Sequence, residues 1–171
     1  LILNNQDIIG ESATGSGKTL AFAAGIIDHT QRDQGIQALV LVPTRELAEQ
    51  VKEEIITLSY NKPLRIIPIY GGVSINPQTN QLKPANIVIA TPGRLLDHLN
   101  RRSIDLSQVK TLVLDEADRM VEMGFIEDVE QIILACPRER QTLLFSATMA
   151  GPAKEIAKKY MKSPVTITAV K

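Results

Sequence analysis

The sequence of 171 residues contains no tryptophan, a single cysteine and few aromatic residues of any kind, 4% in all. Because Cys136 has no partner within the chain, an internal disulfide framework is excluded, and the sequence suits a reducing compartment. We expect this thiol to be buried and inert. So few rings also disfavour a platform on which the bases of a nucleic acid would stack.

Net charge is absent as well, since 19 basic residues balance 19 acidic ones. The chain as a whole therefore gives no reason to expect a polyanionic partner, and any binding to nucleic acid must depend on local groups. Long apolar runs are also missing. Stretches such as 111–114 and 132–135 fall far short of the roughly 20 residues that span a bilayer. We expect a soluble protein without a membrane partner.

The first residues, Leu-Ile-Leu-Asn-Asn-Gln, contain neither a basic region nor an initiating methionine. They lack the pattern of a signal peptide and look like the interior of a longer polypeptide. We expect a cytoplasmic protein, or a nuclear one if the source is a eukaryote.

What the sequence does contain is an alternation of short apolar runs with segments of helical spacing. The spacing is clearest at 44–58 and 124–135, where apolar residues recur every three or four positions. The apolar runs, expected to be strands buried on both faces, are 7–10, 38–42, 65–70, 86–90, 111–114, 142–145 and 165–170. Their alternation predicts one doubly wound α/β domain over residues 1–171, a parallel sheet flanked by helices. The polar segment 76–84 predicts a helix or a loop. In such folds ligands bind at the carboxyl ends of the strands.

The segment after the first predicted strand has the pattern of a phosphate-binding loop, Ser-Ala-Thr-Gly-Ser-Gly-Lys-Thr at 12–19. Glycines allow backbone N–H groups to turn toward phosphate oxygens, and the following helix N-terminus adds positive charge. The expected nucleotide contacts are Ala13, Thr14, Gly15, Ser16, Gly17, Lys18 and Thr19. Lys18 would neutralise the β and γ phosphates, and Thr19 would offer its hydroxyl to Mg²⁺. Ser12 stands where a Gly or Ala usually opens the loop, so its polar group needs a partner. A Gly/Ser-rich turn that caps a helix is the alternative.

An acidic tetrapeptide, Asp-Glu-Ala-Asp at 115–118, directly follows the buried run 111–114. Asp115 is therefore expected at the carboxyl end of a strand, within reach of a metal ion held by Thr19. Asp115 would hold Mg²⁺, often through water, while Glu116 orients and deprotonates an attacking water. Together with Lys18, this pair predicts hydrolysis of ATP. An acidic cluster that only stabilises a helix N-terminus is the alternative.

This tetrapeptide and four further motifs resemble the first domain of the DEAD-box RNA helicases. The others, in the family's order and each after a predicted strand, are Pro-Thr-Arg-Glu-Leu-Ala at 43–48, Gly-Gly at 71–72, Thr-Pro-Gly-Arg at 91–94 and Ser-Ala-Thr at 146–148. The resemblance extends over nearly the whole chain. It implies a RecA-like domain with ATP and Mg²⁺ as cofactors, which drives the unwinding of RNA duplexes.

Amides, hydroxyls and guanidinium groups at strand ends suit phosphate and ribose oxygens. The resemblance implies that one set of such positions lines the path of single-stranded RNA: Pro43, Thr44, Arg45, Gly71, Gly72, Thr91, Pro92, Gly93 and Arg94. We expect a grip on the RNA backbone with little base preference, so that affinity falls as salt rises. Helix capping by the threonines and surface salt bridges of the arginines are the alternatives.

The resemblance also assigns a coupling role and missing parts. The hydroxyls of Ser146 and Thr148 would contact Asp118 and link nucleotide state to RNA state, with helix capping as the alternative. The family reads adenine through a glutamine-containing motif upstream, and Gln6 lies too close to the loop to take that role. The second RecA-like domain, a partner in the same polypeptide, supplies arginines worth about 10³ to 10⁵ in turnover. We expect both parts to be absent here, and the chain to be a monomer that hydrolyses ATP very slowly alone.

Two other functions compete with this interpretation. A phosphate-loop ATPase of another kind, or a GTPase, would leave the intermediate motifs unexplained, and Asn61-Lys62-Pro63-Leu64 lacks the Asp that reads guanine. A nucleotide-dependent RNA clamp that does not unwind would use the same residues, so the sequence does not distinguish it. His29 and His98 are expected to be ordinary surface or boundary residues.

Overall fold

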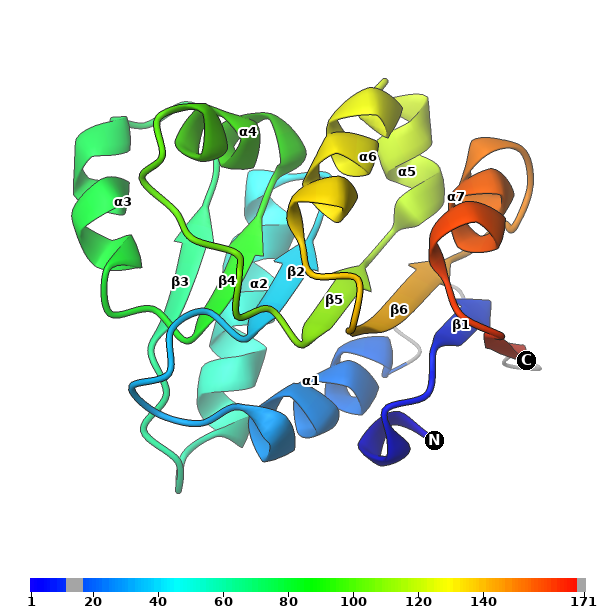
Figure 1. The fold of residues 1–171 in the computed structure, drawn as a ribbon, viewed down its shortest axis with the longest axis horizontal. Helices are drawn as coiled ribbons and strands as arrows, with labels where there is room; N and C mark the ends of the chain where they lie inside the picture. The colour runs from blue at the N-terminus through cyan, green and yellow to red at the C-terminus, as the bar shows by residue number, and fades with distance from the viewer. Residues whose placement is uncertain (12–16, 169–171) are drawn as a thin grey trace.

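The computed structural model describes residues 1–11 and 17–168, and within them seven parallel strands form one sheet (Figure 1). The strands are β1 (Ile8–Glu11), β2 (Ala38–Leu41), β3 (Ile66–Ile69), β4 (Ile87–Ala90), β5 (Thr111–Leu114), β6 (Gln141–Ser146) and β7 (Val165–Thr168). The helices are the 3₁₀ turn η1 (Ile2–Asn4), α1 (Lys18–His29), α2 (Arg45–Leu58), α3 (Ile75–Leu82), α4 (Pro92–Asn100), α5 (Ala117–Glu122), α6 (Ile126–Ala135) and α7 (Pro152–Tyr160). The strand order is β3-β4-β2-β5-β6-β1-β7.

The predicted doubly wound α/β architecture is confirmed. Each predicted apolar run overlaps a strand, every strand pairing is parallel, and the polar segment after Ser74 forms helix α3. Strands β2, β4, β5 and β6 are buried at every residue, because helices cover both faces of the middle of the sheet.

Strand β7 departs from the prediction of burial on both faces. Val165 is half-buried and residues 166–168 are exposed, because β7 lies at the edge of the sheet beside β1. The last two residues of the predicted run, 169–170, lie outside the described residues. At the opposite edge, β3 is only partly buried and contains Pro68, which an edge strand tolerates because one side makes no ladder hydrogen bonds.

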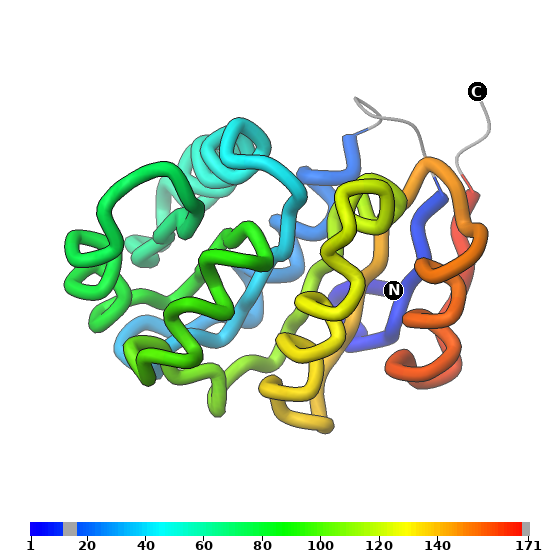
Figure 2. Tube along the Cα trace, turned by 90° about the horizontal axis from the view of Figure 1, so that it is seen from above, coloured from blue at the N-terminus to red at the C-terminus, as the bar shows by residue number. Residues whose placement is uncertain are grey.

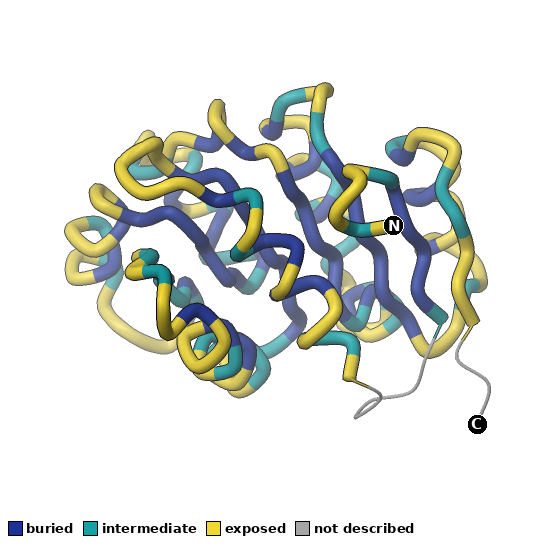
Figure 3. The backbone as a smooth tube through the Cα atoms, turned by 90° about the horizontal axis from the view of Figure 1, so that it is seen from below, coloured by how far each residue is buried: buried dark blue, intermediate teal, exposed yellow. Residues whose placement is uncertain are grey.

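Helices α1 and α2 cover one face of the sheet, and α4, α5, α6 and α7 cover the other (Figures 1 and 2). On the first face Phe22 and Ile55 pack against the sheet; on the second, Leu95, Met120 and Ile132 do so. All five side chains are at most 1% exposed, and burying each stabilises the fold by about 1.5–3 kcal/mol. Figure 3 shows the result as a buried sheet between helices whose outer sides are exposed.

Several helices begin at residues that favour a helix start. The hydroxyl of Thr44 accepts a hydrogen bond from the N–H of Leu47 at 3.2 Å, which caps α2. Helices α4 and α7 begin with Pro92 and Pro152, a residue favoured at the first helical position. In the part of the chain that the structure describes, none of the helices has the length and apolar character needed to cross a membrane.

Candidate functional site

The candidate residues lie beyond the carboxyl ends of the strands. This border of the sheet is the edge on which the site is built. Neighbouring strands β5, β6 and β1 lead into the acidic tetrapeptide, the Ser-Ala-Thr motif and the phosphate loop, whereas β3, β4 and β2 lead into the other three motifs. Hydrogen bonds continue the register past the strand ends: the N–H of Asp115 donates to the carbonyl of Leu41, and that of Thr91 to Ile69, both at 2.9 Å. Two groups of residues therefore lie side by side on one edge.

The described end of the phosphate loop has the geometry of an anion site. Gly17 precedes α1 with a φ of 82°, in the left-handed region that favours glycine, and Lys18 and Thr19 open the helix. The first turn of a helix presents unpaired N–H groups and positive partial charge to an anion. Four candidate residues lie outside the described residues: Ala13, Thr14, Gly15 and Ser16.

Asp115 is a buried carboxylate under the electrostatic influence of Lys18. Its side chain is 3% exposed, and its Oδ1 accepts a hydrogen bond from the N–H of Glu116 at 3.0 Å. Burial raises the pKa of Asp115 to about 6, against the positive charge of Lys18, which lowers it. The topology of the sheet places the start of α1 and the end of β5 at the same edge. The Thr19 hydroxyl and the Asp115 carboxylate are oxygen donors, the kind of ligand that Mg²⁺ prefers.

Glu116 has an unusual backbone conformation. Its φ of 51° and ψ of 50° are left-handed, which costs a non-glycine residue about 1–2 kcal/mol. Its carboxylate lies 3.4 Å from Nη1 of Arg119, and its side chain is only 15% exposed. Local strain of this kind often occurs at functional sites. With this conformation, the backbone turns at Glu116 away from the direction of strand β5.

Asp118 is tied to the turn that follows β6. Its N–H donates to Oγ of Ser146 at 3.2 Å, and its Oδ2 accepts from both the N–H and the hydroxyl of Thr148, at 3.2 and 3.3 Å. The Ser146 hydroxyl in turn donates to the carbonyl of Thr148 at 2.7 Å. Neither hydroxyl caps the next helix, α7, whose N-cap is Gly151. Hydrogen bonds therefore connect the start of α5 to the end of β6, whereas the coupling role stays a prediction.

Arg45 is held over an aromatic ring on the other half of the edge. Its guanidinium centre lies 4.9 Å from the ring centroid of Tyr70, at the distance of a cation–π contact. The Tyr70 hydroxyl donates to Glu49, which also pairs with Lys52 at 2.6 Å. Hydrogen bonds from Lys52 and Tyr70 lower the pKa of the Glu49 carboxyl. Arg45 itself is exposed at the surface.

Arg94 is anchored between α4 and the loop after β3. Its Nη1 donates to Oε1 of Gln78 at 3.1 Å, its Nη2 donates to the carbonyl of Val73 at 3.0 Å, and its Nε lies 3.6 Å from Asp97. The side chain is 12% exposed. Since an arginine has five N–H donors, these contacts do not exhaust its capacity to bind an anion.

The remaining candidates for RNA contact divide by exposure. Gly71 and Gly72 are exposed, and Gly72 has a φ of 79° that favours glycine. Thr44, Thr91 and Gly93 are half-buried, and Thr91 makes no side-chain cap. Two candidates, Pro43 and Pro92, are buried, so they shape the backbone rather than present a surface.

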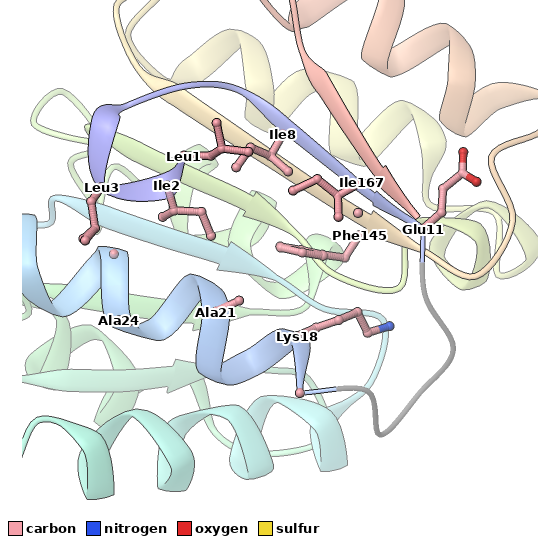
Figure 4. Close-up of a pocket in the computed structure, with 13 residues that line it drawn as sticks. Leu1, Ile2, Leu3, Ile8, Glu11, Lys18, Ala21, Ala24, Phe145 and Ile167 are labelled. Carbon is pink, nitrogen blue, oxygen red and sulfur yellow. The ribbon is translucent and has the colours of Figure 1, made fainter. Parts of the chain in front are cut away.

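An apolar cavity of about 520 Å³ adjoins the start of α1 (Figure 4). Ile8, Ala21, Phe145 and Ile167 are among the residues that line it, and Leu1, Ile2 and Leu3 border it from η1. Among the described residues, its charged lining side chains are Glu11 and Lys18. The cavity thus offers an apolar surface next to the phosphate loop and little that could read the edge of a base.

Comparison with known families agrees with this geometry. Residues 1–156 match the family model of the DEAD/DEAH box helicases. The chain belongs to this helicase family. Among curated relatives, it is 52% identical over 167 residues to the ATP-dependent RNA helicase CshA of Listeria monocytogenes, covering 96% of this chain and 32% of the relative. It is also 52% identical over 162 residues to the probable ATP-dependent RNA helicase MJ0669 of Methanocaldococcus jannaschii, covering 94% of this chain and 44% of the relative.

Solved structures of helicases of this family share the fold closely. A DEAD box protein from Methanococcus jannaschii superposes with a TM-score of 0.97 at 51% identity, over 99% of this chain and 47% of that one. The yeast DEAD-box splicing factor Prp28 superposes with a TM-score of 0.91 at 36% identity, over 97% of this chain and 42% of that one. The predicted RecA-like domain of a DEAD-box helicase is thereby confirmed. The chain spans only about a third to a half of these relatives' length.

The helicase fold also contains contacts that the sequence analysis missed. His98, expected at the surface or boundary, is fully buried in α4, where its ring nitrogens lie 2.7 Å from Oγ of Ser103 and 3.2 Å from Oε1 of Gln78. Burial, followed by the nearby charge of Arg94, lowers its pKa. The roles of Gln78 and Tyr70 were not anticipated either. The one available signal was that Gln78 falls on the apolar side of the 76–84 segment, next to Leu82.

Proposed function

We propose that this chain is the nucleotide-binding motor domain of an ATP-dependent RNA helicase, which acts together with a second RecA-like domain. The observation that carries the proposal is that the phosphate loop and the acidic motif follow strands β1 and β5 of one parallel sheet, with the buried Asp115 directly after β5. The names of the relatives, which are ATP-dependent RNA helicases, support the same function.

For the nucleotide, Lys18 and the first turn of α1 would bind the β and γ phosphates. Thr19 and Asp115 would hold Mg²⁺, which when bound supplies positive charge against the phosphate oxygens. Glu116 would accept a proton from the attacking water. Burial of Asp115 keeps this carboxylate in a site with little water, where its attraction to a cation is strongest.

For the RNA, the exposed amides at Gly71 and Gly72 and the guanidinium groups of Arg45 and Arg94 would contact backbone phosphates. These groups come from neighbouring strands, so they offer a row of donors along one edge. Such contacts do not read bases, and the affinity of the chain for single-stranded RNA should therefore depend on salt rather than sequence.

For coupling, the contacts of Asp118 with Ser146 and Thr148 would carry changes at the acidic motif to the turn after β6. The second domain would supply the arginines of the transition state, so this chain alone should hydrolyse ATP very slowly. An RNA-stimulated turnover of a few per second in the 171-residue chain would contradict that expectation.

The test of nucleotide binding is a titration of a fluorescent ATP analogue with Mg²⁺. We expect Lys18→Ala and Asp115→Asn to weaken binding at least about tenfold, since each removes a charge-assisted contact. Lys110→Ala is the matched control, because this exposed lysine lies at the opposite end of β5. Equal affinities for all four proteins would refute the proposed site.

A further inference from the structure

Gln78 connects two of the motifs proposed to contact RNA. This glutamine of α3 is 5% exposed, and its Nε2 donates to the main-chain carbonyl of Tyr70 at 3.0 Å. Its Oε1 accepts from Nη1 of Arg94 at 3.1 Å and lies 3.2 Å from Nε2 of His98. One buried amide therefore holds the residue before the Gly71–Gly72 pair and the arginine of the Thr-Pro-Gly-Arg motif at the same time.

His98 supports the amide of Gln78. Because Oε1 of Gln78 can only accept, Nε2 of His98 donates to it, while Nδ1 lies 2.7 Å from the Ser103 hydroxyl, which also donates to the His98 carbonyl at 3.2 Å. The buried ring thus braces the amide. Each polar atom of the Gln78 amide has a partner, which makes its orientation unique.

Tyr70 extends the same connection to the third motif. Its carbonyl accepts from Gln78, its ring lies under the guanidinium group of Arg45, and its hydroxyl donates to Glu49. The loop of residues 70–74 is thus fixed at its start by both α2 and α3, and at Val73 by Arg94. Within the part of the chain that the structure describes, the sheet gives the exposed amides of this loop no ladder hydrogen bonds, because β3 ends at Ile69.

We propose that Gln78 and Tyr70 are positioning residues that hold Arg45, the Gly71–Gly72 amides and Arg94 as one prearranged surface for a nucleic-acid backbone. This inference rests on the proposed function of the edge. Neither residue needs to touch the RNA. Their contribution is to remove the cost of ordering long arginine side chains and a glycine loop at the moment of binding.

Two substitutions at Gln78 distinguish the effect of its bond to the Tyr70 carbonyl from that of its bond with Arg94. Gln78→Ala releases both the loop and Arg94. Gln78→Glu retains acceptor oxygens for Arg94 but loses the donor to the Tyr70 carbonyl. We expect Gln78→Ala to weaken binding of the 171-residue chain to a fluorescein-labelled oligouridylate about 2- to 12-fold, the cost of ordering one flexible side chain, and Gln78→Glu to have a smaller effect.

A matched control and a double-mutant cycle distinguish the proposed positioning role of Gln78 from a role in stability alone. Gln141 is also a buried glutamine, 3% exposed, and its Nε2 donates to the carbonyls of Ile2 and Gln6 at the opposite end of the sheet. Gln141→Ala should lower the melting temperature without changing RNA affinity. In an Arg94→Ala background, the effect of Gln78→Ala should shrink, because the side chain that it orders is gone. Equal effects of Gln78→Ala and Gln141→Ala on RNA affinity would overturn the inference.

Backbone NMR order parameters test the inference without RNA. We expect Gln78→Ala to lower the order parameters of the Gly71 and Gly72 amides, and Tyr70→Phe, which keeps the ring but removes the bond to Glu49, to lower them less. Unchanged order parameters in Gln78→Ala would overturn the inference. If the unmodified chain failed to bind the oligouridylate, the proposed function would fail, whereas the order parameters would still decide whether Gln78 holds the loop.

Discussion

Replacing the buried Asp115 by asparagine should stabilise the chain in the absence of nucleotide and metal while it weakens Mg²⁺-ATP binding. The ionised carboxylate is held in a site that is 3% exposed, and its pKa is raised from 3.8 to about 6, chiefly by burial. An asparagine of the same shape keeps an oxygen to accept the hydrogen bond from Glu116 N–H, and it carries no charge to bury.

The sign and size of the effect follow from linkage. A carboxyl whose pKa is higher in the folded state favours folding when protonated, so its stabilising effect is present below about pH 4 and is lost as the pH rises through 6. A tenfold change in proton affinity corresponds to about 1.4 kcal/mol, so the ionised Asp115 costs about 3 kcal/mol at about pH 7.5. At about pH 5 the cost is only about 1.6 kcal/mol, because the folded carboxyl is mostly protonated there.

Urea unfolding in EDTA at these two pH values measures the effect. Asp115→Asn should raise the free energy of unfolding at both, by about 1.4 kcal/mol more at the higher pH. Asp33→Asn is the control, because that carboxylate is 85% exposed and its replacement should leave the free energy of unfolding nearly unchanged. A stability gain that does not depend on pH, or a loss of stability, would refute the argument that Asp115 is a buried charge retained for binding.

Two further substitutions and one labelling experiment test the packing of the fold that supports the site. Asp7→Ala should lower the free energy of unfolding in urea by about 3 kcal/mol or more. The Asp7 carboxylate accepts hydrogen bonds from the N–H groups of Thr142 and Lys162, at 2.8 and 2.7 Å. A loss below about 1 kcal/mol would contradict this expectation. Gly10→Ala should lower stability by about 1–3 kcal/mol, since the new methyl carbon would stand 2.5 Å from the Phe145 ring; an unchanged melting temperature would show that the ring can move. The Cys136 thiol, whose pKa burial raises to about 11, should resist a thiol reagent at mildly alkaline pH until the chain is unfolded, and rapid labelling of the folded chain would argue against its burial.

The sheet could be predicted because its signal is local. Apolar runs bounded by polar residues, such as those that became β2 and β5, suit strands covered on both faces, and the order of motifs fixed where the chemistry should lie. Strand β7 was misjudged for the complementary reason. Whether an apolar run ends at the centre or the edge of a sheet depends on which strand it pairs with, which no local pattern records.

The contacts that hold the candidate residues in place escaped prediction for the same reason. The burial of His98 depends on α4 packing against the sheet with Gln78 and Ser103 beside it, and these partners lie 20 and 5 residues away in sequence. The ring under Arg45 comes from the end of β3. Motif spacing identifies groups that touch a ligand, whereas the groups that hold them are defined only by tertiary structure.

The position of the two candidate sites along the sheet offers a physical reason for their proposed coupling. The nucleotide group follows β5, β6 and β1, the nucleic-acid group follows β3, β4 and β2, and the two groups meet where β2 pairs with β5. At that seam the N–H of Asp115 donates to the carbonyl of Leu41, two residues before Pro43. Both groups open on the same edge, so one second domain that covers this edge would contact both ligands at once.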